Sequence, residues 1–208
     1  MMSGRYTILT EGSLERRRQQ RRRRLRRLLY MALALVAVGA GVGLYFVLKP
    51  SPPPPNNYSG TIDVDGQDRP YHVHLPPSYD GQTPLPVVLA FHGLSQTTDS
   101  LRTISELDQA ADANGFIVVY PEGFLRVWEV DRVDIHQVDD LHFVDALLDR
   151  LSEELNVDEG RIYATGFSRG AVFVHRLACE RSDRFAAFAA VAGALSSILY
   201  RECEPPRP

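Results

Sequence analysis

Residues 166–170 (Gly-Phe-Ser-Arg-Gly) place a serine between two glycines, a spacing that is typical of a nucleophilic serine. They lie between a run typical of a strand (161–165) and a run typical of a helix (171–179). A serine flanked by glycines at such a corner is typical of the nucleophile elbow of serine hydrolases. The turn exposes the hydroxyl and places the N–H of Arg169 at a helix N-terminus, facing developing negative charge. We therefore predict Ser168 as a nucleophile, with a plain strand-to-helix turn as the alternative.

A serine nucleophile also needs a base to accept its proton and a carboxylate to orient that base. The only histidine after Ser168 is His175, seven residues on. Along a helix this spacing is about two turns, or roughly 10 Å, so we expect His175 to serve helix packing. His92 and His142 lie in other predicted elements and are poor substitutes. We therefore expect the histidine and the acid of a triad to be missing from this chain.

Two further groups of residues have types that could do chemistry. His72 and His74 fall on one face of an alternating run, but no third ligand accompanies them, so we expect an outward strand face and no metal. Asp139 and Asp140 could suggest acid–base chemistry. Because they directly precede a predicted helix, we interpret them as caps that interact with the helix dipole.

The elements that position Ser168 alternate along the chain. The apolar patterns predict strands at 58–64, 71–75, 84–91, 116–120, 161–165 and 185–191, and helices at 97–114, 139–155 and 171–179. Strands alternating with helices indicate an α/β protein with a parallel sheet covered on both faces. Ser168 then lies at the carboxyl end of a central strand, where open α/β sheets place their sites.

Charge divides the 208-residue chain into a basic end and an acidic remainder. Residues 1–49 contain eleven basic and two acidic residues, whereas residues 50–208 contain twelve basic and 24 acidic ones. An acidic domain is a poor match for nucleic acid, so we expect no nucleic-acid partner. The basic excess comes from an arginine-rich tail, residues 1–27.

Residues 28–48 form an uncharged run of 21 residues. As a helix the run is about 31 Å long, enough to cross a bilayer core, so we predict a transmembrane helix. A cleaved signal peptide is the alternative. The arginines that precede the run predict a cytoplasmic N-terminus and an extracytoplasmic remainder. Residues 49–57 are proline-rich and predict a semi-rigid linker to a globular domain at 58–208.

Cys179 and Cys203 are the only cysteines. Outside the membrane they could form a disulfide, and two buried free thiols are the alternative. We favour the disulfide because of the predicted topology.

Several motifs together resemble one family. They are Leu-Pro-Pro-Ser-Tyr at 75–79, Phe-His-Gly at 91–93, the strand motif at 115–121, Val-Asp-Asp at 138–140 and the elbow motif at 161–171. In this combination the chain resembles the polyhydroxybutyrate depolymerase and feruloyl esterase group of α/β-hydrolases, over roughly residues 58–205. The resemblance implies a mostly parallel sheet with helices on both faces, incomplete at its C-terminal edge and preceded by the membrane helix.

The resemblance also implies a function. It implies hydrolysis of carboxylic esters through an acyl-enzyme on Ser168, with the N–H groups of Leu94 and Arg169 as the oxyanion hole. His92 belongs to the oxyanion-loop motif, and Trp128 lies on a loop, so both are expected at the substrate pocket. Expected partners are hydroxyalkanoate, aryl or polysaccharide-linked esters and the membrane, and no metal or organic cofactor is implied.

The family places its catalytic acid and histidine after the next strand, beyond the end of this chain. We expect a fragment of a longer reading frame, a truncated inactive relative, or a base supplied from elsewhere, in that order. A membrane-tethered pseudohydrolase that binds a ligand or partner is the alternative function, and an acyltransferase is a weaker one.

Overall fold

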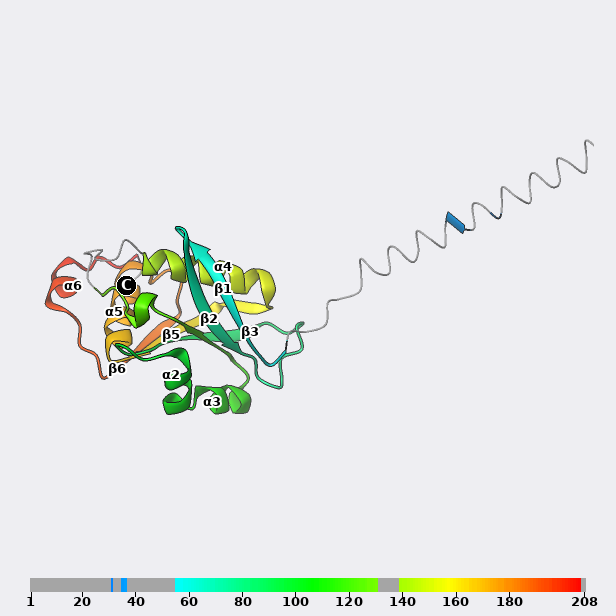
Figure 1. Cartoon of the computed structure of the whole chain (residues 1–208), viewed down its shortest axis with the longest axis horizontal. Coiled ribbons are helices and arrows are strands. Elements are labelled where there is room, and N and C mark those ends of the chain that lie inside the picture. Colours follow the sequence, from blue (N-terminus) through cyan, green and yellow to red (C-terminus); the bar gives the residue numbers. More distant parts are fainter. Residues whose placement is uncertain (1–30, 32–34, 37–54, 131–138, 207–208) are drawn as a thin grey trace, which may run out of the picture. The chain divides into compact units, whose positions relative to one another are not determined.

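A computed structural model describes residues 31, 35, 36, 55–130 and 139–206 of the chain (Figure 1). The chain divides into two units, Met1–Pro52 and Pro53–Pro208, and the second contains nearly all of the described residues. The predicted arginine-rich tail and most of the predicted membrane helix and linker lie outside these residues. Within the described part of the chain, no helix combines the length and apolar character needed to cross a membrane.

The described residues of the second unit form a six-stranded mixed sheet in the order β1-β2-β4-β3-β5-β6. The strands are β1 (Asn57–Val64), β2 (Gln67–His74), β3 (Leu85–Phe91), β4 (Ile117–Pro121), β5 (Val157–Phe167) and β6 (Ala187–Val191). The β1–β2 and β2–β4 pairs are antiparallel, while β3 pairs in parallel with β4 and β5, and β5 with β6. The α/β prediction is confirmed, with β3 and β5 at the centre of the parallel part.

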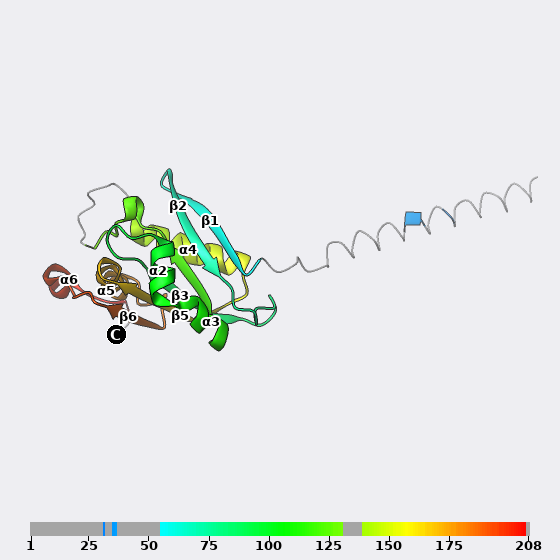
Figure 2. The same cartoon turned by 60° about the horizontal axis from the view of Figure 1, so that its bottom comes forward.

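Helices cover both faces of this sheet. They are α2 (Thr98–Ser105), α3 (Leu107–Asn114), α4 (Asp140–Glu154), α5 (Arg169–Glu180) and α6 (Ser197–Glu202), with a short 3₁₀ turn η1 (Phe124–Arg126). Figures 1 and 2 show α2 and α3 together on one side of the sheet and α4 on the other. The buried clusters agree, since α4 and α5 share one core with β3 and β5, whereas α2 and α3 share a smaller one with β4.

The core follows from the apolar runs of the sequence. All five residues of β4 are buried, as expected of a parallel strand covered on both faces. The predicted apolar face of α4 is buried too, including Phe143, Leu147 and Leu151. By contrast, β6 lies at an edge of the described sheet, and four of its five residues are exposed. The end of β5 that leads to Ser168 therefore lies between the well-packed strand β3 and the sparsely packed edge strand β6.

The prediction of one helix over residues 97–114 is wrong. Glu106 adopts a left-handed conformation (φ 53°, ψ 24°) and separates α2 from α3. The break lets Arg102 donate to the carboxylate of Asp108 over 2.6 Å. The predicted ends are right, because Thr97 caps α2 and Gly115 ends α3 with φ 71°. The left-handed Glu106 thus divides the run into two helices, and Arg102 of α2 pairs with Asp108 of α3 across the break.

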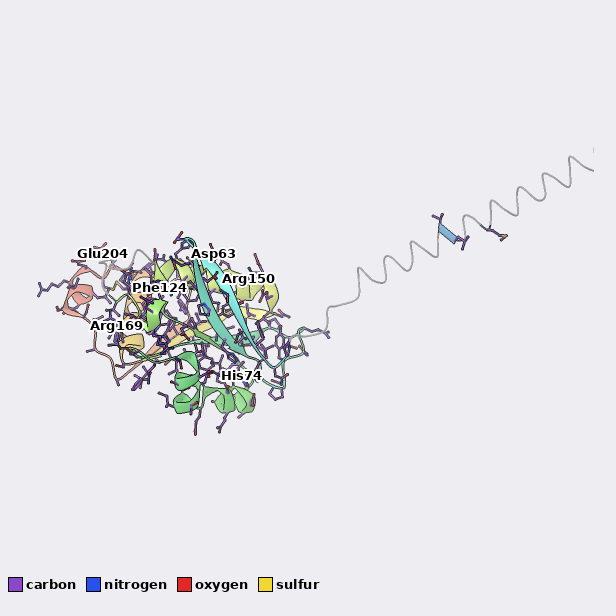
Figure 3. The ribbon with its side chains drawn as sticks, viewed as in Figure 1. Asp63, His74, Phe124, Arg150, Arg169 and Glu204 are labelled. Carbon is purple, nitrogen blue, oxygen red and sulfur yellow. A yellow bond between two sulfur atoms is a disulfide. The ribbon has the colours of Figure 1, made fainter. Side chains whose placement is uncertain are left out.

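The prediction of an outward face for His72 and His74 is wrong for His74. That ring is buried beside α3 (Figure 3), with its Nε2 2.8 Å from Asp112 Oδ1 and its Nδ1 2.9 Å from Asn57 Oδ1. The prediction overlooked that α3 covers this end of the sheet. The described residues contain no cluster of side chains suited to holding a metal ion.

Candidate functional site

Ser168 occupies the sharp corner between β5 and α5. Its backbone has φ 53° and ψ −113°, a conformation that residues with a Cβ rarely adopt. Such strain persists only where the surroundings fix it, and it is frequent at active sites. The Ser168 N–H donates to the carbonyl oxygen of Val191 over 2.9 Å, and its own carbonyl oxygen accepts from Val172 N–H over 3.1 Å. The corner therefore has the geometry of a nucleophile elbow.

The glycines on either side make this corner sterically feasible. A Cβ at Gly166 would lie 2.5 Å from the carbonyl oxygen of Gly170. A Cβ at Gly170 would collide with the carbonyl oxygens of Phe91 and His92, the latter at 2.6 Å. The first turn of α5 consequently packs directly on the end of β3, which brings the elbow against the loop that follows β3.

That loop carries the predicted oxyanion donor Leu94. Gly93 N–H donates to Gln96 Oε1 over 2.9 Å, Gln96 N–H to the Gly93 carbonyl over 3.1 Å, and Ser95 N–H to the Arg126 carbonyl over 3.0 Å. Among the described residues, the N–H of Leu94 has no hydrogen-bond partner. Hydrogen bonds therefore fix the loop at Gly93 and at Ser95, the two neighbours of Leu94.

The other predicted donor, the N–H of Arg169, belongs to the first residue of α5. An N–H at this position has no acceptor within its own helix, and it lies at the positive end of the helix dipole. The assignment of the Leu94 and Arg169 N–H groups to an oxyanion hole stays a prediction.

His92 is fully buried below the loop. Its Nε2 accepts from Gly123 N–H over 3.0 Å, so its Nδ1–H donates to the Gly93 carbonyl over 2.8 Å. Burial lowers the pKa of His92, although its bond to Gly93 opposes the shift. Both ring nitrogens are engaged, so His92 is a neutral support for the loop and is unsuited to serve as a base.

Trp128 is also fully buried. Its ring stacks on Phe173 with 5.1 Å between ring centroids and meets Phe91 edge-on, also at 5.1 Å. Its indole N–H donates to the His92 carbonyl over 3.0 Å. The structure therefore places His92 and Trp128, both expected at the substrate pocket, in the core behind the loop.

An apolar hollow of about 480 Å³ lies beside the elbow. Its lining residues are Ala90, Leu101, Ile104, Ser105, Leu107, Thr165, Gly166, Phe167 and Val191. It follows β5 on the α2 side of the sheet, away from His92 and Trp128.

The remaining residues weighed for chemistry lie elsewhere. His175 Nε2 is 3.4 Å from the Gly193 carbonyl oxygen, in agreement with a packing role. Asp139 caps α4 by accepting from Leu141 N–H and His142 N–H. Asp140, expected as a second cap, is instead buried against Arg69 at 2.5 Å. Within the described part of the chain, the Oγ of Ser168 has no hydrogen-bond partner.

Cys179 and Cys203 form a disulfide with 5.4 Å between their Cα atoms, which confirms that prediction. The bond joins the last turn of α5 to the segment after α6. The disulfide therefore attaches the segment after α6 to α5, the helix that begins at the elbow.

The fold and the elbow together define an α/β-hydrolase. The Esterase family, whose description is "Putative esterase", matches residues 63–201, and the chain belongs to this family.

The chain is similar to the bifunctional acetylxylan esterase/xylanase XynS20E of Neocallimastix patriciarum, with 32% identity over 130 residues that cover 62% of this chain and 18% of that protein. It is also similar to feruloyl esterase D of Neurospora crassa, with 26% identity over 153 residues that cover 67% of this chain and 50% of that protein. A crystal structure of a thermostable esterase shares the fold, with a TM-score of 0.57, 23% identity and coverage of 70% of this chain and 44% of that one. The chain thus spans half or less of the length of these relatives. These findings confirm the resemblance to feruloyl esterases.

Sequence reasoning missed several residues that shape the site. The side chain of Gln96 accepts from the loop after β3, the carbonyl of Val191 accepts from the elbow, and the side chain of Arg169 donates to the Trp128 carbonyl. Arg176 is buried on α5 and donates to the carbonyl and the carboxylate of Glu129. Only Arg176 left a signal in the sequence, as an arginine on the otherwise apolar face of the predicted helix.

Proposed function

We propose that the chain carries the nucleophile and oxyanion hole of a serine carboxylic-ester hydrolase. The Oγ of Ser168 attacks the ester carbonyl carbon, and the alcohol leaves with a proton. Water then hydrolyses the acyl-enzyme and releases the acid. The observation that supports this role is the strained backbone of Ser168 at the N-terminus of α5.

During the attack, negative charge develops on the carbonyl oxygen of the ester, and backbone N–H groups are the donors proposed to stabilise it. The N–H groups of Leu94 and Arg169 bind this oxygen and stabilise the tetrahedral intermediate. One such donor is typically worth about 10²–10³ in kcat. Leu94 is 56% exposed, so an incoming ester can approach the loop from solvent.

For the substrate class we propose acetyl and feruloyl esters of plant polysaccharides. The similarity to the acetylxylan esterase/xylanase and to feruloyl esterase D supports this class. Polyhydroxyalkanoate esters are a second class, to be compared in the same assay.

The experiment measures hydrolysis of p-nitrophenyl acetate, acetylated xylan and methyl ferulate by the chain and by Ser168→Ala. We expect Ser168→Ala to abolish hydrolysis above the buffer rate. Ser152→Ala is the matched control, because Ser152 is an exposed serine on α4. Hydrolysis above the buffer rate that is equal for the chain and for Ser168→Ala would refute the assignment of the nucleophile. A folded chain without any hydrolysis would favour a ligand-binding pseudohydrolase.

We also propose that residues 28–48 anchor the esterase domain outside the cytoplasm. The uncharged run follows nine arginines between residues 16 and 27, which favours a cytoplasmic N-terminus. The disulfide suits an oxidising compartment. Protease added to intact cells should remove the esterase domain, and deletion of residues 28–48 should release it from membranes. A chain that alkaline carbonate extracts from membranes would contradict the anchor.

A further inference from the structure

The half-buried side chain of Arg169, labelled in Figure 3, bonds the loop between β4 and α4. Its Nε donates to the carbonyl oxygen of Trp128 over 2.9 Å. Only the backbone N–H of this residue has a role in the proposed chemistry. The side chain therefore has a separate task.

The hydrogen bonds continue from Trp128 to the loop after β3. The indole N–H of Trp128 donates to the carbonyl oxygen of His92 over 3.0 Å, and His92 lies two residues before Leu94. The bond of Trp128 to His92 is buried, and the bond of Arg169 to Trp128 is partly buried. A continuous path therefore runs from Arg169 through Trp128 to His92, and it links one proposed oxyanion donor to the loop that carries the other.

A second path fixes the same two segments. Ser95 N–H donates to the Arg126 carbonyl over 3.0 Å, and Gly123 N–H donates to His92 Nε2 over 3.0 Å. Residues 123–128 thus contact the loop at His92 and Ser95, on either side of Leu94. They contact the elbow through Arg169.

We infer that the Arg169 side chain and the Trp128 indole are positioning groups that set the spacing between the N–H groups of Leu94 and Arg169. This inference rests on the proposed esterase function. An oxyanion hole must hold its donors about 2.7–3.1 Å from the oxygen of the transition state, so small displacements lower the rate. Neither side chain touches the substrate in this role.

Two substitutions test the inference with little change of shape. Arg169→Met keeps a long side chain without a donor, and Trp128→Phe keeps an aromatic ring without the indole N–H. Arg181→Met is the matched control, because Arg181 lies beyond α5 and donates to Asp145 over 2.8 Å. We expect both test variants to lower kcat on the order of 10- to 100-fold with little change in KM, since misplaced donors weaken mainly transition-state binding. Arg181→Met should leave both constants unchanged.

Hydrogen exchange provides a readout that does not depend on turnover. In both test variants the amides of Gly93, Ser95 and Gly123 should exchange about tenfold faster, while those of β3 and β5 keep their protection. Unchanged exchange at these three amides would overturn the inference, as would equally faster exchange throughout the domain. If the chain and Ser168→Ala hydrolyse equally, the esterase proposal fails, and the exchange rates still decide whether the path positions the loop.

Discussion

The backbone N–H of Ser168 donates a hydrogen bond to the carbonyl oxygen of Val191 over 2.9 Å. Val191 ends β6, and Gly193 beyond it packs so closely that a Cβ there would lie 2.6 Å from the Ser168 carbonyl oxygen. The elbow is therefore braced from the neighbouring strand as well as by its own strand and helix. This bracing explains how a serine holds a backbone conformation that is otherwise costly.

Ser168→Gly should be more stable than Ser168→Ala. Alanine keeps the Cβ that is strained at φ 53°, whereas glycine has no Cβ. The strain is of order 1–3 kcal/mol, and the extra entropy of unfolded glycine offsets about 0.5–1 kcal/mol. We expect glycine to gain about 1 kcal/mol over alanine in urea unfolding. An alanine variant at least as stable as the glycine variant would show that the corner is unstrained.

Gly170→Ala should destabilise the domain strongly. The added Cβ would collide with the backbone of Phe91 and His92, which cannot move without disturbing β3. We expect a loss of about 3 kcal/mol in the free energy of unfolding, as for severe overpacking. Gly160→Ala is the control, since its nearest contact would be the Asp158 side chain at 3.3 Å. Similar unfolding midpoints for the two variants would contradict the tight contact between α5 and β3.

The elbow could be predicted from the sequence because its determinants are local. The strand before Ser168, the helix after it and the two glycines lie within a few residues of one another, and each has a recognisable pattern. The observed β5 and α5 only extend the predicted strand and helix. The parallel pairing of β3 with β4 and with β5 also agrees with the parallel sheet expected from alternating strands and helices.

The supports of the site could not be predicted because their partners are distant in sequence. Arg69 and Asp140 are 71 residues apart, and the sequence indicated only a helix cap for Asp140. Trp128 and His92 lie next to loop-forming residues, which suggested a pocket, but the bonds of their polar atoms to the backbone allow full burial. Tertiary packing determines which of these distant residues meet, and the periodicity of apolar residues in the sequence does not reveal it.

The stability of the domain should fall as the pH drops below about 6.5. Burial lowers the pKa of His92 and of His72, and the charge of Arg102 lowers that of His72 further. Below the ordinary histidine pKa the unfolded chain binds protons that the folded chain resists, so the free energy of unfolding decreases with falling pH. Above it both states are neutral and this contribution to stability is complete.

His92→Gln tests the share of His92 in this pH dependence. Glutamine keeps a polar group near the Gly123 N–H and cannot take up a proton. Urea unfolding from about pH 7.5 to about pH 5 should show a flatter pH profile for the variant, even if it is less stable at every pH. An unchanged slope would mean that the His92 ring titrates in the folded protein as in the unfolded one.

Reduction of the Cys179–Cys203 disulfide should destabilise the domain by about 3 kcal/mol. The bond closes a loop with a sequence separation of 24, and the chain-entropy relation gives this magnitude for such a loop. The double variant Cys179→Ala/Cys203→Ala should reproduce the loss in unfolding experiments, and reducing agent should then have no further effect. After reduction, the amides of α6 should lose their protection from hydrogen exchange before those of the rest of the domain, because the disulfide attaches the segment after α6 to α5. Equal unfolding midpoints with and without reducing agent would show that packing alone holds this segment beside the elbow.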